Sequence, residues 1–289
     1  MPGRMSRPGH LWHTVGISEQ VTIAMISRYS PWACLLAGVL SVPVAHADDD
    51  TINPDRPNVA NSSQVVGPDR VELELGVQWD RQRDADAHVR TLTTPVLLRV
   101  GLSDALELRV ETAGRTIARA SDPASGEHTV SAGWADSAAG VKWHLGDQDG
   151  MRPSWGVIAE AALPTGSTAL RGTGFRPSLN VPLEWDLGHD WSLGVMPGVG
   201  RDGDDNGARY TYGVFAASLG KAFSERLHGF AELAAPQIAR AAHGGTQTIF
   251  DTGLSWLVSR DCQLDAMLVH GLNRNTPDLS LAFGLSVRR

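Results

Sequence analysis

The sequence predicts an all-β protein, namely a transmembrane up-and-down antiparallel β-barrel of about 12 strands that follows a cleaved signal peptide. Three observations predict this fold. Apolar and polar residues alternate with period two from residue 70 to the C-terminus. Short and long connections alternate along the chain, and tryptophans gather near the ends of the predicted strands. Short turns at one rim, longer loops at the other and two aromatic belts are typical of outer-membrane barrels.

The first 47 residues are predicted to be an export signal. Residues 32–44 form an apolar run that is too short to span a bilayer as a helix. Arg28 precedes this run, and an Ala-His-Ala sequence just before residue 48 provides a small-residue cleavage site. We therefore assign residues 1–47 to an N-terminal extension and secretory signal peptide, with Met25 as an alternative start that gives a leader of ordinary length. A buried helix is the other interpretation of the apolar run.

Residues 48–69 connect the leader to the first strand. Their motif NPDRPN contains two prolines, which forbid regular strand pairing there. Asp55 and Arg56 are candidates for a plug that folds into the mouth of the barrel. The alternative is a segment that stays in the periplasm. The remaining residues, 70–289, are predicted to form the outer-membrane barrel.

Twelve runs of about ten residues each have the length that a tilted membrane-spanning strand requires. In the first run, Val71, Leu73 and Leu75 alternate with Glu72 and Glu74. Strict alternation predicts a sheet with one apolar and one polar face. The predicted strands span residues 70–79, 91–101, 105–114, 136–145, 153–162, 175–187, 190–200, 208–219, 226–235, 246–257, 261–271 and 278–288.

The connections between these runs are of two kinds. Short turns lie at residues 102–104, around His189, around 259–261, and at 146–152 and 221–225. Longer loops are predicted at 80–90, 115–135, 163–174, 201–207, 236–245 and 272–277. Because the strand count is even, both chain termini are expected at the short-turn rim.

The tryptophans are expected to form an aromatic girdle at both membrane interfaces, where an indole ring is half apolar and half wet. The predicted girdle residues are Trp79, Trp134, Trp143, Trp155, Trp185, Trp191 and Trp256. A soluble all-β sandwich or propeller shares the period-two pattern. It does not account for the alternating connection lengths or for tryptophans at strand ends, so we favour the membrane barrel.

Several phrases of the chain resemble one family. They are NPDRPN (53–58), VELELGVQWD (71–80), LLRVGLSDALELRV (97–110), LPTGS (163–167) and SLNVPLEWDLGHDWSLGV (178–195). Together they are similar to bacterial outer-membrane transporters of the meta-pathway of phenol degradation, a MetA-pathway phenol degradation-like β-barrel. The resemblance spans roughly residues 50–288 and implies passage of aromatic compounds. The chain departs from the usual aromatic end of such barrels, because it closes with Ser286-Val287-Arg288-Arg289.

Residue parity predicts which charged side chains face the lumen. A polar interior is expected of any such barrel. Two interpretations stay open, a salt-bridged network that braces the wall and a constriction of alternating charge that admits small solutes. The predicted lumen-lining residues are Glu72, Glu74, Arg99, Glu107, Arg109, Glu111, Lys142, Glu160, Glu184, Glu232, Asp251 and Asp265.

No metal or cofactor site is predicted. Loop 201–207, RDGDDNG, resembles the first half of a calcium loop, but the twelfth position is Gly213 rather than glutamate. We interpret it as a hairpin loop, with a weak calcium site as the alternative. Cys262 is the single cysteine outside the leader, which leaves neither an intrachain disulfide nor a multi-cysteine metal site.

The sequence therefore predicts a channel of the bacterial outer membrane for passive passage of small hydrophobic or aromatic solutes. Its expected partners are outer-membrane lipid, the outer-membrane assembly machinery and the solute. A net charge of −7 and the lack of a basic stripe in the sequence argue against a nucleic-acid partner. The chain is not expected to be an enzyme, because no G-x-S-x-G motif accompanies His228 and His270. The alternatives are a barrel enzyme acting on lipid and a closed structural or adhesion barrel.

Overall fold

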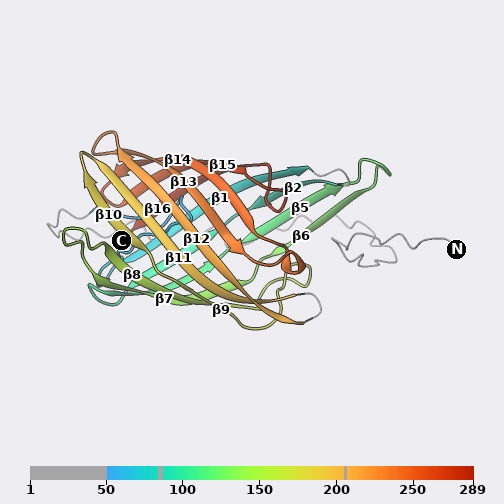
Figure 1. Cartoon of the computed structure of the whole chain (residues 1–289), viewed down its shortest axis with the longest axis horizontal. Coiled ribbons are helices and arrows are strands. Elements are labelled where there is room, and N and C mark those ends of the chain that lie inside the picture. The colour runs from blue at the N-terminus through green and yellow to red at the C-terminus, as the bar shows by residue number, and fades with distance from the viewer. Residues whose placement is uncertain (1–50, 84–86, 205–206) are drawn as a thin grey trace, which may run out of the picture. The chain divides into compact units, whose positions relative to one another are not determined.

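The chain forms an antiparallel β-barrel in a computed structural model that describes residues 51–83, 87–204 and 207–289 (Figure 1). The predicted leader lies outside these residues. The strands are β1 (Val71–Arg83), β2 (His88–Thr93), β3 (Val96–Gly101), β4 (Leu106–Thr112), β5 (Arg115–Ser121), β6 (His128–Trp134), β7 (Ser137–Gly146), β8 (Ser154–Leu163), β9 (Arg176–Asn180), β10 (Leu183–Gly188), β11 (Trp191–Gly203), β12 (Arg209–Ala222), β13 (Leu227–Ile238), β14 (Gln247–Ser259), β15 (Cys262–Gly271) and β16 (Leu279–Arg288).

The sixteen strands make twelve spans of the wall. Four pairs of consecutive strands continue one another across a two-residue irregularity: β2 with β3, β4 with β5, β6 with β7, and β9 with β10. The first of these irregularities holds Pro95, which cannot donate to a ladder. The prediction of about twelve antiparallel strands is confirmed.

The barrel closes between its first and last strands. β1 pairs with β16 from Glu72↔Arg288 to Arg81↔Leu279, and on its other edge it pairs with β3 and then β2. Because neighbouring strands in sequence are also neighbours in space, the topology is up-and-down. Closure satisfies the backbone groups of both terminal strands, as a membrane wall requires.

The predicted loop 115–135 is instead largely a hairpin of β5 and β6, which lengthens the wall at the long-loop end (Figure 1). The strand pattern is hard to see in the sequence because small residues such as Ala, Ser and Gly weaken the contrast between the two faces. Among the described strands, β6 pairs with β5 alone. The other edge of β6 meets the loop between β8 and β9, where Ser167 donates its backbone N–H to the Trp134 carbonyl at 2.9 Å.

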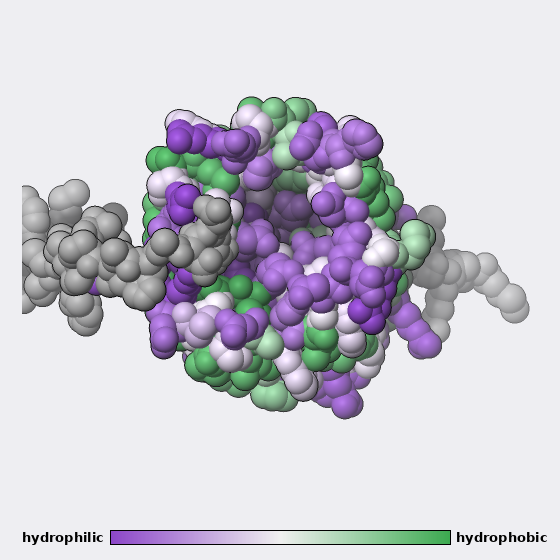
Figure 2. Space-filling view, turned by 90° about the vertical axis from the view of Figure 1, so that its left-hand side faces the viewer, coloured by the Kyte–Doolittle hydropathy of each residue, from purple (hydrophilic) through white to green (hydrophobic). Residues whose placement is uncertain are grey.

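Apolar side chains cover the outside of the barrel, and charged ones fill the inside. Figure 2 shows a hydrophobic outer surface around a hydrophilic hollow. Val77, Leu108 and Phe283 are exposed on the outside, whereas Arg99, Lys142 and several glutamates are fully buried inside. This inside-out distribution fits a wall that is surrounded by lipid.

The register places all seven predicted girdle tryptophans on the outward side of the wall. Trp143, Trp155, Trp185, Trp191 and Trp256 lie at the short-turn end, and Trp79 and Trp134 lie at the long-loop end. Trp185 donates its indole N–H to the Met151 carbonyl at 2.9 Å. The described part of the chain contains no helix that is long and apolar enough to cross a membrane.

Candidate functional site

Residues 51–66 lie inside the barrel rather than beside it. Ile52, Asp55 and Ser63 are buried, and so is Val66. The prolines of this segment prevent it from adding a strand, so its backbone N–H groups need other partners. We call residues 51–66 the plug segment.

Lumenal carboxylates supply those partners. Four of the predicted lumen-lining glutamates accept backbone N–H groups of the plug segment. The contacts are Asp55 N and Arg56 N to Glu74 (3.1 and 3.0 Å), Val59 N and Ala60 N to Glu232 (2.7 and 2.8 Å), Ser63 N to Glu184 (2.6 Å) and Val66 N to Glu107 (2.9 Å). Each of these bonds satisfies a backbone N–H group that has no strand partner. The carboxylates therefore bind the segment along its whole length.

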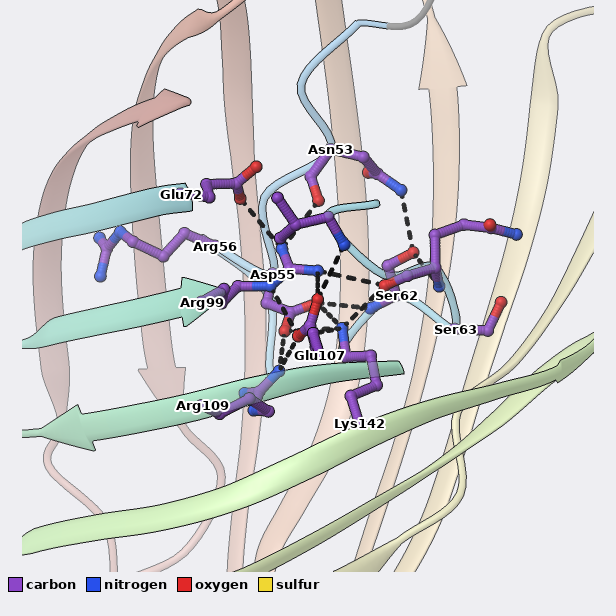
Figure 3. Close-up of polar contacts among 12 residues, drawn as sticks. Asn53, Asp55, Arg56, Ser62, Ser63, Glu72, Arg99, Glu107, Arg109 and Lys142 are labelled. Carbon is purple, nitrogen blue, oxygen red and sulfur yellow. Dashed lines mark hydrogen bonds and ion pairs between the residues drawn. The ribbon is translucent and has the colours of Figure 1, made fainter. Parts of the chain in front are cut away.

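Asp55 joins the plug segment to two cations of the wall (Figure 3). Its carboxylate accepts from Arg109 Nη1 and from Lys142 Nζ at 2.7 and 2.9 Å. Burial disfavours ionisation, but Arg99, Lys142 and Arg109 outweigh it and hold the pKa of Asp55 well below its usual range. The ionised Asp55 contact is therefore kept throughout the ordinary carboxyl range and is lost only when the pH falls below it.

Arg99 joins the wall and the plug segment in one network. Its guanidinium contacts Glu72 at 3.0 Å, Glu107 at 2.9 and 3.0 Å and Glu74 at 3.4 Å. It also donates to the backbone carbonyls of Asn53 and Gln64, each at 3.1 Å. The planar fork of an arginine suits several acceptors at once. Figure 3 shows Arg99 beside Asp55, with Glu72 and Glu107 on either side.

The other predicted residues are placed as follows. Arg56 reaches the opposite wall and pairs with Asp265 at 3.2 Å. Glu160 accepts from Arg109 Nε at 2.8 Å. Asp251 lies directly across the ladder from Glu232, and both of its carboxylate oxygens lack a hydrogen-bond partner among the described residues. Glu111 lines the cavity on the long-loop side of the plug segment.

The plug segment separates two cavities. The cavity on the long-loop side has a volume of about 720 Å³, and the one on the short-turn side about 810 Å³. Residues 55–58 line both. The lumen therefore consists of two vestibules with the plug segment between them.

Small polar residues contribute contacts that the sequence reasoning missed. Ser63 and Ser154 face each other with hydroxyl oxygens 2.8 Å apart, and Asn58 donates to Ser218 at 2.9 Å. The run NSSQ at 61–64 could have indicated these contacts, because Ser and Asn side chains form hydrogen bonds in segments without regular secondary structure.

Asp136 was also missed by the sequence analysis, and it holds the loop that follows β8 over the vestibule on the long-loop side. Asp136 accepts from Gly166 N at 2.7 Å, from Gly172 N at 2.8 Å and from Arg176 Nη2 at 2.6 Å. Each partner lies 30 to 40 residues from Asp136 in the sequence, so no local sequence pattern predicts these contacts. They fix the loop that follows β8 at the barrel mouth.

The histidines considered for lipid chemistry are not brought together. His228 lines the short-turn vestibule, whereas the register places His270 on the outward side near the long-loop end. Asp202 pairs with Arg176 at 3.5 Å, and Asp204 accepts from Ala208 N at 2.8 Å, as in a hairpin loop. No cluster of three metal-ligating side chains occurs in the residues that the structure covers.

One family model and several solved structures match the chain. The family model described as "Putative MetA-pathway of phenol degradation" matches residues 54–288. The COG4313 outer membrane channel from Pseudomonas putida F1 superposes with a TM-score of 0.57 at 14% identity, covering 81% of this chain and 99% of that one.

Two further structures are similar. The β domain of the Bordetella autotransporter BrkA gives a TM-score of 0.50 at 14% identity, over 75% of this chain and 98% of that one. The CymD monoaromatic hydrocarbon channel gives 0.42 at 10% identity, over 77% and 88%. No curated protein matches the chain. The fold is that of a bacterial outer-membrane β-barrel.

Proposed function

Because the chain belongs to the MetA-pathway phenol degradation family, we propose that it is an outer-membrane channel for passive passage of small hydrophobic or aromatic solutes. The observation that carries this proposal is the plug segment between two vestibules. A channel with a closed resting state can stay selective, because water-filled passage for sugars and ions is blocked until the segment moves.

The sequence left a salt-bridged network and a solute constriction as alternatives. In this proposal the same charged residues serve both roles. Arg99, Arg109 and Lys142 hold the segment through Asp55 and the carbonyls of Asn53 and Gln64. The same charges brace the wall through Glu72, Glu107 and Glu160. Movement of the segment would expose them to the passing solute.

The vestibule on the long-loop side fits an amphipathic solute. Its lining combines apolar Leu97, Leu170 and Pro57 with charged Arg109 and Asp136. An aromatic ring with one hydroxyl or carboxyl group matches such a mixture, since ligand sites combine apolar walls with a few polar groups. No enzymatic role is proposed, and outer-membrane lipid and the assembly machinery are proposed as partners in the membrane.

The test is uptake by intact porin-deficient bacteria that express the chain with its leader. We expect labelled phenol to enter faster with expression, whereas a neutral sugar of similar size gains nothing. Deletion of residues 51–66 should abolish this discrimination, because the open lumen is polar. The proposal fails if the full chain speeds sugar and phenol equally, or if neither solute enters faster with or without the plug segment.

A further inference from the structure

The outward face of the barrel carries a basic cluster at its long-loop end. We define the basic cluster as Arg81, Arg83, His88, Arg90, Arg119 and His128, which lie on β1, β2, β5 and β6. They surround a groove of about 490 Å³. The groove is separate from the lumen, because the cluster side chains share parity with outward Trp79 and Leu92.

Three of these arginines stand directly opposite one another. Arg81 is the ladder partner of Arg90, and Arg90 is the partner of Arg119. Like charges at directly opposed positions destabilise a sheet. A row of three guanidinium groups across adjacent strands therefore implies an anion that bridges them.

No described protein group serves as that anion. Among the residues that the structure covers, none of the four cluster arginines forms an ion pair, and Arg81 Nε is buried without a hydrogen-bond partner. Asp278 accepts from the backbone N–H of Arg83 at 2.9 Å, and Asp122 accepts from Ser125 Oγ within its own turn.

The position of the basic cluster along the barrel axis indicates which anion it can meet. The next outward row toward the membrane centre is Trp79, Leu92 and Ile117, which contains one tryptophan of the aromatic belt at the long-loop end. β2, β5 and β6 reach the long-loop end of the barrel (Figure 1), and long loops of such barrels face the cell exterior. The cluster therefore lies at the headgroup level of the outer leaflet.

We propose that the basic cluster binds the phosphate groups of the outer-leaflet glycolipid, with Arg81, Arg90 and Arg119 as the phosphate-binding row. Guanidinium groups bind phosphate oxygens through paired N–H donors. The glycolipid has both required parts, since its acyl chains would lie against the row below while its phosphates neutralise the arginines. A bound lipid would anchor the β5–β6 hairpin, whose far edge pairs with none of the described strands.

The test uses the full-length chain, expressed with its leader and purified from outer membranes in detergent. Native mass spectrometry would follow binding of bis-phosphorylated lipid A to the unaltered chain and to R81Q/R90Q/R119Q. We expect the triple variant to bind about a hundredfold more weakly, at roughly a fivefold loss for each charge near an anionic headgroup. R81K/R90K/R119K should retain most of the binding, which separates charge loss from misfolding.

The matched control is R152Q/R226Q/R260Q, which removes the same charge from the short-turn rim and should bind like the unaltered chain. Equal binding by the two glutamine triples would overturn the proposal. Complete displacement of lipid A by millimolar inorganic phosphate would overturn the lipid assignment, because the site would then be a simple anion site.

Discussion

Replacing Asp55 with asparagine should open the channel. The D55N variant removes one carboxylate that faces Arg109 and Lys142 and lies near Arg99. Breaking a buried ion pair by neutralising one partner costs about 3–5 kcal/mol. The closed state should therefore be weakened at least about a hundredfold relative to open states.

Single-channel recording in planar bilayers measures this change as the fraction of time spent open. D80N is the control. Asp80 lies on the lumenal face of β1, like Glu72 and Glu74, and its carboxylate accepts a hydrogen bond from Gln78 rather than from the plug segment. We expect frequent long openings for D55N, and for D80N the short and infrequent openings of the unaltered chain. Equal open fractions in the two variants would mean that Asp55 does not hold the segment.

Replacing Arg99 with methionine should weaken the wall as well as the plug segment. R99M leaves Glu72, Glu74 and Glu107 without their shared cation in a buried cluster. We expect the free energy of unfolding to fall by about 3–5 kcal/mol. The measurement is the denaturant midpoint, followed by tryptophan fluorescence and by the heat-modifiable band on a gel.

The double variant R99M/E72Q separates charge imbalance from lost packing. Glu72 contacts Arg99 at 3.0 Å, and its removal relieves part of the uncompensated negative charge. It should recover part of the lost stability, since residues in one network show strong coupling. If R99M is as stable as the unaltered chain, the cluster around Arg99 does not brace the barrel.

Much of the barrel could be predicted because lipid imposes a simple rule. Each strand must be apolar outside and can be polar inside, so Val71 and Leu73 alternate with Glu72 and Glu74 over the whole span. The plug segment could be suspected because Pro54 and Pro57 exclude a strand while Asp55 and Arg56 add charge.

The contacts of the site could not be predicted, because they depend on long-range register. Asp55 meets Lys142 from 87 positions away, and Arg56 meets Asp265 from 209. The arginine row was hidden for a different reason. Arg81, Arg90 and Arg119 fall in segments 80–90 and 115–135, which the sequence predicts to be loops, whereas the structure places them in β1, β2 and β5.

The central claim is that the plug segment must move for the channel to open. It is tested most directly by locking that segment with a reversible cross-link. The Ser63 and Ser154 hydroxyl oxygens lie 2.8 Å apart, which brings cysteines at these positions within reach of a disulfide. The measurement is planar-bilayer conductance of S63C/S154C with Cys262 replaced by serine, compared with C262S alone. We predict no openings in the oxidised double-cysteine variant and normal openings after reduction, with C262S unaffected by either treatment. Equal openings in the cross-linked and reduced forms would contradict the account.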